Sequence, residues 1–155
     1  MEPLVSSVKI DSVNFGKNVS VIQPVNLYGC RLGDNVFVGP FVEIQRNSNI
    51  GRNTKVQSHS FICEFVDIGE DCFVGHSVVF INDVFSMGGP AGGNKSLWKS
   101  TRVGNRVSIG SNSTILPVDI CDDVIIGAGS VVTKNITKSG VYAGNPAKIL
   151  QRKRE

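Results

Sequence analysis

The sequence is poor in aromatic residues, charged residues and leucine. Aromatic residues make up 7% of the 155 residues and charged residues 19%, and six leucines stand beside 22 valines and 14 isoleucines. Because leucine favours helices while β-branched residues favour strands, this balance argues against a helical bundle or a coiled coil. The hydrophobic share of 41% argues against a disordered chain. We therefore expect an all-β fold in a single domain, residues 1–155.

Several classes of protein need features that this sequence lacks. No apolar run approaches the roughly 18 residues of a membrane helix, and no basic segment with an apolar core opens the chain, so we expect a cytoplasmic protein without a membrane partner. A net charge of +3, without a stripe of aromatic and basic residues, argues against nucleic-acid binding. The four cysteines form no CxxC pair, and their spacing argues against a metal site.

A six-residue repeat runs through most of the chain. Steps of six from Phe15, shortened to five at two places and interrupted once, meet eighteen positions up to Val132 that are all Val, Ile, Leu or Phe. The fifth position of each unit is small or β-branched, and the fourth is rich in Asn, Asp and Gly, which tolerate a left-handed backbone. Each unit therefore predicts a short strand followed by a corner. Three units form one triangular coil, and about six coils stack as parallel strands. Cys63, Cys72 and Cys121 fall at small-residue positions, which predicts packing roles for them.

Two segments depart from the repeat. Phe80 and Val103 are 23 residues apart, so a glycine-rich insertion at about residues 84–101 predicts one long protruding loop. The loop carries the only tryptophan, Trp98, either as an anchor of the loop or as a contact to a ligand. After Ile136 we expect a cap at about residues 139–155 that includes a short C-terminal helix.

The repeat resembles that of the hexapeptide-repeat acyltransferases, which fold as left-handed parallel β-helices. Residues 120–136 are similar to their closing coil, and residues 142–149 (YAGNPAKI) to their C-terminal signature. This resemblance implies acetyl-coenzyme A as cosubstrate, no metal, and a homotrimer with active sites between subunits. It also implies that pantetheine contacts the backbone around four residues: Gly110, Ser111, Gly127 and Ala128. Lys148 and Arg152 are candidates for the coenzyme's phosphates, the alternative being a solvated helix face.

The middle of the chain resembles a narrower group. Residues 56–64 and 74–83 are similar to 3-N-acetyltransferases that act on dTDP-linked 3-amino-3,6-dideoxyhexoses, sugars of lipopolysaccharide and other surface polysaccharides. The resemblance implies that Glu64, Asn82 and Asp83 line the amino-sugar pocket, with Gln57 as a further substrate contact. Relatives that act on UDP-linked amino sugars share the Gln, Glu and Asn positions but lack the matching Asp. They define the alternative substrate class.

The spacing of the repeat independently groups Glu64 with Asn82. They are 18 residues apart, one full coil, and both stand third in their units, so they should stack about 4.8 Å apart on the outside of one side of the prism. Such a site would hold an amine near a thioester carbonyl, and the proton could pass to Glu64, to His59 or to the departing thiolate. His76 is expected to be a surface residue.

The same fold is compatible with two other functions. A β-helix carbonic anhydrase needs three histidines to hold zinc, and the chain has two. A non-catalytic scaffold stays an alternative, which a test of coenzyme A binding separates from an enzyme.

Overall fold

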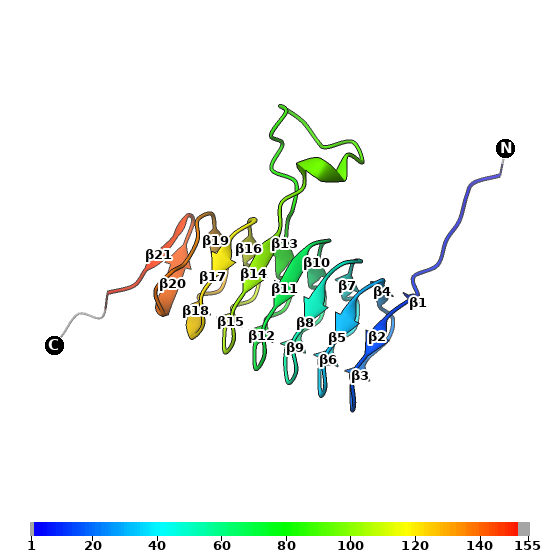
Figure 1. Cartoon of the computed structure of the whole chain (residues 1–155), viewed down its shortest axis with the longest axis horizontal. Helices are drawn as coiled ribbons and strands as arrows, with labels where there is room; N and C mark the ends of the chain where they lie inside the picture. The colour runs from blue at the N-terminus through cyan, green and yellow to red at the C-terminus, as the bar shows by residue number, and fades with distance from the viewer. Residues whose placement is uncertain (1, 152–155) are drawn as a thin grey trace.

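The computed structural model describes residues 2–151, which form a left-handed parallel β-helix (Figure 1). Three parallel sheets make the sides of the prism, and consecutive strands of the chain pass from sheet A to sheet B to sheet C. Sheet A contains β1 (Ile10–Asp11), β4 (Asn26–Tyr28), β7 (Glu43–Ile44), β10 (Phe61–Ile62), β13 (Val79–Phe80), β16 (Thr114–Ile115) and β19 (Val131–Val132). Sheet B contains β2 (Asn14–Phe15), β5 (Arg31–Leu32), β8 (Asn49–Ile50), β11 (Val66–Ile68), β14 (Thr101–Val103) and β17 (Asp119–Ile120). Sheet C contains β3 (Ser20–Val21), β6 (Phe37–Val38), β9 (Lys55–Val56), β12 (Phe73–Val74), β15 (Ser108–Ile109), β18 (Val124–Ile126), β20 (Gly140–Gly144) and β21 (Ala147–Ile149).

The register of the sheets follows the repeat. Phe61 pairs with Glu43 and Val74 with Val56, so a coil of three full units uses 18 residues. A coil that contains a five-residue unit uses 17, as in the pairing of Asn26 with Glu43. The prediction of a parallel β-helix of about six coils is confirmed. β1 extends sheet A at the N-terminal end and β20 extends sheet C at the other end, which lengthens the solenoid beyond the repeat itself.

The first position of each repeat fills the interior. Sixteen of the eighteen predicted residues are buried, and the two exceptions, Phe15 and Val21, lie in the first coil, where no earlier coil covers them. Fifth-position residues are buried as well, including serines and a threonine. Their hydroxyls bridge successive corners: Ser60 Oγ donates to Gly75 O at 2.8 Å and accepts from Val78 N at 3.3 Å. A hydroxyl is stable in this narrow core because it supplies a hydrogen-bond partner to a backbone carbonyl and to a backbone N–H that would otherwise have none.

The corners explain two further columns of the repeat. Thirteen of the eighteen fourth-position residues have φ between +55° and +69°; eight of them are Asn18, Asn35, Asn47, Asn53, Asp71, Asn112, Asp123 and Gly129. Second-position glycines allow successive coils to approach each other closely. A Cβ on Gly75 would lie 2.7 Å from Ile109 O and 2.8 Å from Ser111 N, so a side chain there would push the next coil away.

The insertion forms a loop that projects from the prism between β13 and β14 (Figure 1). It spans residues 81–100 and includes one turn of 3-10 helix, η1 (Lys95–Leu97), which Asn94 caps by accepting from Ser96 N at 3.2 Å. No helix within residues 2–151 has both the length and the apolar character needed to cross a membrane.

The expected C-terminal helix is wrong for the residues that the structure describes. Ala147–Ile149 form β21, which pairs antiparallel with β20 and extends the hairpin through a bond from Leu150 N to Val141 O at 2.7 Å. Two local features favour a turn over a helix here: Gly144 has φ +105°, and Pro146 cannot donate a backbone hydrogen bond. The second strand also pairs the edge that β20 would otherwise leave open.

The outward faces of the three sheets differ in polarity. Sheet B carries an exposed polar row: Asn14, Arg31, Asn49, Asp67, Arg102 and Asp119. From β10 to β19, sheet A instead presents a half-buried, largely apolar row: Phe61, Val79, Thr114 and Val131. Over the same coils sheet C also presents a largely apolar row, Phe73, Ser108, Ile125 and Val141, so sheets A and C are both less polar than sheet B.

Candidate functional site

The turns that join sheet A to sheet B bring Glu64 and Asn82 together; we call these turns, at residues 45–48, 63–65 and 81–83, the Glu64 corner. Glu64 follows β10, and Asn82 follows β13 one coil later. Asn82 Nδ2 donates to the backbone carbonyl of Glu64 at 3.2 Å, as expected for neighbouring rungs. Both residues are buried, at 6% and 9% exposure, rather than standing on the outer face. Phe65 makes the turn with φ +67°, an unusual conformation for a bulky residue.

Cationic side chains surround the carboxylate of Glu64. Lys95 Nζ, from the loop, donates to Oε1 at 2.8 Å and to Oε2 at 2.9 Å, and Arg46 Nε lies 3.9 Å from Oε1. The side chain of Glu64 is 7% exposed, whereas those of Lys95 and Arg46 are 48% and 56% exposed. The corner therefore combines a buried anion with cations that reach it from solvent.

The loop is fastened to the same corner. Asp83 accepts through Oδ1 from Phe85 N at 3.0 Å and through Oδ2 from Ala91 N at 2.7 Å. Lys99 N donates to Asn82 O at 2.8 Å, and the Trp98 ring lies 6.4 Å from the Phe65 ring. In this state Asp83 organises its own loop, and Trp98 serves as an anchor while also lining an open pocket. That pocket, of about 370 Å³, has in its wall Gln45, Phe61, Cys63, Asn82, Asp83 and Trp98.

A polar ladder leads from Glu64 toward the N-terminal end. Gln45 Oε1 accepts from Glu64 N at 3.3 Å, and Gln45 Nε2 donates to Glu43 Oε1 at 2.8 Å. The Arg46 guanidinium lies 5.3 Å from the centre of the Tyr28 ring. Burial, followed by the charge of Glu43, raises the pKa of Tyr28. A polar cavity of about 560 Å³ opens beside Tyr28 and Arg46, with room for further polar groups of a ligand.

The structure does not bring Gln57 and His59 to Glu64. They lie in the turns that join sheet C to sheet A, at residues 57–60, 75–78, 110–113 and 127–130, which we call the His59 corner. β10 separates the two corners within one chain. His59 has φ +64° and its ring packs 4.8 Å from that of Phe41, while His76 is exposed in the next turn.

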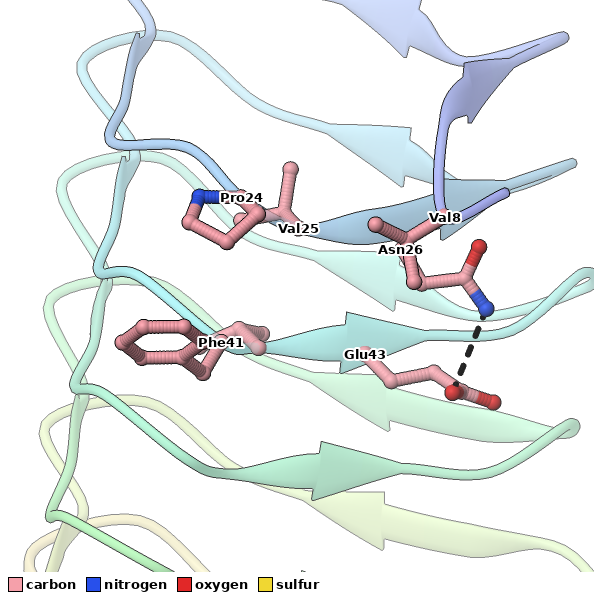
Figure 2. A pocket seen from close by; sticks show the side chains of 7 residues that line it. Val8, Pro24, Val25, Asn26, Phe41 and Glu43 are labelled. Atoms are coloured by element: carbon pink, nitrogen blue, oxygen red, sulfur yellow. Dashed lines mark hydrogen bonds between the residues drawn. The ribbon is translucent and has the colours of Figure 1, made fainter.

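Phe41, in the turn between β6 and β7 one coil before the His59 corner, also lines an apolar pocket of about 210 Å³. Figure 2 shows its ring facing Pro24, with Val8 from the N-terminal arm nearby and Asn26 donating to Glu43 at 3.2 Å. This pocket holds no group suited to acid–base or acyl-transfer chemistry apart from Glu43, whose carboxylate already accepts from Asn26, Tyr28 and Gln45. We do not assign the chemistry to it.

The four candidates for pantetheine contact also lie at the His59 corner, and they fall into two pairs. Gly110 N and Gly127 N donate within the ladder, to Ile126 O and Tyr142 O, and their carbonyls accept from Ser113 or Ser130. A Cβ on Gly110 would collide with the backbone of Ala128. These glycines hold the coils together. Ser111 and Ala128 lie in the same turns, and Ala128 is exposed to solvent.

The remaining candidates lie at the C-terminal end. Lys148 is exposed on β21, in a hairpin and not on a helix face. Arg152 falls outside the described residues. Among residues 2–151 no group of three or more His, Cys, Asp or Glu side chains is placed to hold a metal ion.

Comparison with known proteins agrees with the repeat. Residues 29–64 match the model of the bacterial transferase hexapeptide (six repeats), and residues 100–134 match that of the hexapeptide repeat of succinyl-transferase. The chain thus contains transferase-type hexapeptide repeats in both halves of the solenoid. This hexapeptide-repeat protein is 34% identical over 124 residues to the bifunctional protein GlmU of Streptococcus uberis. The match covers 79% of the chain and 24% of that relative, so the chain spans about a quarter of the curated relative's length.

Solved structures extend the comparison. The perosamine N-acetyltransferase of Caulobacter crescentus, solved as a mutant with CoA and GDP-perosamine, superposes with a TM-score of 0.65 and 26% identity over 92% of this chain and 57% of that one. A galactoside acetyltransferase in complex with coenzyme A gives a TM-score of 0.63 and 27% identity, over 91% of this chain and 64% of that one. The hexapeptide-repeat protein thus shares its fold with sugar acetyltransferases.

Three residues of the Glu64 corner were missed as candidates from the sequence: Tyr28, Arg46 and Lys95. Arg46 precedes Glu64 by 18 residues, one full coil, so the coil length alone would have placed it in one column with Glu64 and Asn82. Tyr28 lies in the neighbouring column, because β4 and β7 pair residues that are 17 apart. Lys95 offers no periodic signal because it belongs to the insertion.

Proposed function

We propose that this hexapeptide-repeat protein is an acetyl-CoA-dependent N-acetyltransferase whose acceptor is a nucleotide-linked amino sugar. The observation that carries the proposal is the buried Glu64 carboxylate, which is bonded by an ammonium group in a pocket-forming corner beside Asn82. A carboxylate of this kind suits the recognition of an amine. The relatives point the same way, since one was solved with CoA and GDP-perosamine and another with coenzyme A.

The chemistry requires little more than positioning. The neutral amine attacks the thioester carbonyl, the carbon–sulfur bond breaks, and the products are an N-acetyl sugar and the free thiol of coenzyme A. Glu64 is positioned to accept the proton that the amine loses, and the thiolate leaving group is the alternative acceptor. Holding the amine against the carbonyl can contribute about 7–11 kcal/mol through proximity.

We infer a homotrimer with active sites between subunits, because the outward faces of the three sheets differ in polarity. The apolar rows of sheets A and C are both suited to burial against another copy, whereas the charged row of sheet B is not, and we choose sheet A because of the two corners beside it. Sheet A is flanked by the Glu64 corner on one edge and the His59 corner on the other. Packing through sheet A would therefore let the His59 corner of one subunit, with Ser111 and Ala128, complete the Glu64 corner of another.

For the acceptor, we propose the 3-amino group of a dTDP-linked 3-amino-3,6-dideoxyhexose. The Asn82–Asp83 pair next to Glu64 supports it, as does the polar cavity beside Tyr28 and Arg46, where an arginine and an aromatic ring could take a phosphate and a base. A UDP-linked amino sugar is the alternative substrate class, and a scaffold that binds no coenzyme A is the alternative without catalysis.

Steady-state kinetics on variants tests the assignment. With the best sugar of a dTDP-, UDP- and GDP-linked panel, Glu64→Gln and Asn82→Ala should each lower kcat by about 10²-fold while coenzyme A affinity is unchanged. His59→Ala should cost less, because proton transfer is assigned to Glu64 or the thiolate. An inactive His59 variant beside a normal Glu64 variant would move the proton transfer to the histidine.

A further inference from the structure

Lys95 fills the Glu64 corner much as a bound ligand would. Its ammonium nitrogen bonds both carboxylate oxygens, at 2.8 and 2.9 Å, although it comes from a residue 31 positions along the chain. The anion that it meets is 7% exposed, while the lysine side chain is itself 48% exposed. A buried carboxylate is stable only with a cation or donors beside it, so this corner requires a positively charged occupant.

The surroundings of the Lys95 nitrogen are those of an ammonium site. Besides the carboxylate, the Trp98 ring lies with its centre 5.5 Å from Nζ, within the range of a cation–π contact. Phe65 packs beside Trp98, and Arg46 Nε stands 3.9 Å from Glu64 Oε1 on the other side. A carboxylate and an aromatic face together select a compact cation with several N–H donors, which is the description of a primary ammonium.

The loop that carries Lys95 is packed loosely enough to release this side chain from Glu64. Lys95 lies in the single turn η1, outside every strand ladder. The loop before it contains Gly88, Gly89 and Gly93, and a Cβ added to any of these three would meet nothing within 4 Å. The loop is therefore loosely packed here, and displacement of Lys95 would expose little apolar surface.

We propose that Glu64 and Trp98 form an ammonium-binding site that Lys95 occupies in the free protein and that the acceptor's protonated amine takes over when it binds. The proposal rests on the proposed function and adds the state in which the amine arrives. Exchange of one ammonium for another keeps the buried carboxylate compensated throughout. The proton then moves from the bound ammonium to Glu64, which leaves a neutral amine and a carboxylic acid. The second proton, which the amine loses as it is acetylated, passes to the departing thiolate of coenzyme A. Lys95 is thus a competitor for the site, and it favours acceptors with a basic amine over sugars that carry only hydroxyls.

The site can be probed without acetyl-CoA or a nucleotide sugar. Because Trp98 is the only tryptophan in the chain, its fluorescence reports on this corner. We would titrate wild type, Lys95→Met and the matched loop control Lys99→Met with methylammonium chloride, using sodium chloride at equal ionic strength as the reference. The Lys95 variant should respond at about tenfold lower methylammonium concentration than the other two, because the tethered competitor is gone. The double variant Lys95→Met/Glu64→Gln should show no specific response.

Equal titrations for wild type and Lys95→Met, or a response that persists in the double variant, would overturn the ammonium site. Lys95→Arg guards against a folding artefact: it retains a cation at the corner and should titrate like wild type, and a response like that of Lys95→Met would contradict the proposal. Failure of the proposed function reads out differently. If no sugar of the panel is acetylated, the titrations still decide the site; if one is acetylated and Lys95→Met leaves its KM unchanged, the exchange is wrong and the function stands.

Discussion

Replacing Asp83 shows whether its side chain organises the loop or binds the sugar. Its carboxylate accepts from two backbone N–H groups, Phe85 N at 3.0 Å and Ala91 N at 2.7 Å. Hydrogen bonds to a charged group contribute about 1.5–3 kcal/mol each when buried, and these bonds are exposed and part-buried, so we expect Asp83→Ala to cost the loop about 2 kcal/mol in total. Asp83→Asn keeps an acceptor oxygen for one of them and should cost about half.

Hydrogen exchange measures this loss directly. A local cost of about 2 kcal/mol raises the opening equilibrium about 30-fold, and the amide of Ala91 should exchange faster by that factor in Asp83→Ala and by about fivefold in Asp83→Asn. Peptides from residues 55–62, in the coils, serve as the internal control and should not change. Unaltered exchange across residues 84–94, together with a raised sugar KM, would refute the loop role and restore Asp83 as a direct substrate contact.

Three further predictions follow from the coils. Ser60→Ala should lower the free energy of unfolding by about 2–4 kcal/mol, because it leaves Gly75 O and Val78 N buried without a partner. Chemical denaturation measures this loss. A loss no larger than that caused by Ser58→Ala, at a part-exposed serine, would contradict the prediction. Burial raises the pKa of the Cys63 thiol to about 12, so at pH 8 the thiolate fraction of Cys63 should be about a thousandfold below that of an ordinary thiol and should rise about tenfold per pH unit. Peptide mapping after iodoacetamide treatment measures this reactivity. Alkylation of Cys63 as fast as that of the part-exposed Cys121 would contradict the prediction. Val131→Lys, on the apolar face of sheet A, should dissociate the trimer in light scattering, whereas a lysine placed on sheet B should not; a trimer that survives the change would exclude sheet A as the interface.

The architecture was readable from the sequence because a stacked coil imposes the same demands at every turn. The interior is so narrow that each first position must be apolar, and a corner with a left-handed backbone favours Asn, Asp or Gly. The same residue pattern therefore recurs in the eighteen units and predicts the same local structure in each. Phe41, His59, Phe65 and Arg106 break that rule by adopting positive φ with bulky side chains, which the repeat does not predict. Phe65 lies at the Glu64 corner and His59 at the His59 corner.

The parts that failed or were missed are those outside the periodic pattern. The prediction of a C-terminal helix rests on the need of the last coil for a cap, but a β-strand can meet that need as well, and β21 does so by pairing with the edge of β20. Lys95 could not be placed because its contact with Glu64 depends on how a 20-residue loop folds back on the prism. Glu64 was expected on an outer face because its position in the unit was known and the depth of the corner was not.

Acetyl transfer to a nucleotide-linked amino sugar is the central claim, and one experiment tests it most directly. The protein is incubated with acetyl-CoA and, separately, with dTDP-, UDP- and GDP-linked amino sugars, and both the free thiol of coenzyme A and the acetylated sugar are measured, the latter by mass spectrometry. We expect equal amounts of thiol and N-acetylated sugar, greatest with the dTDP-linked 3-amino-3,6-dideoxyhexose, and a reaction about 10²-fold slower with Glu64→Gln. Release of thiol at the buffer rate with every amino sugar, or acetylation that the Glu64 variant supports at full speed, would contradict it.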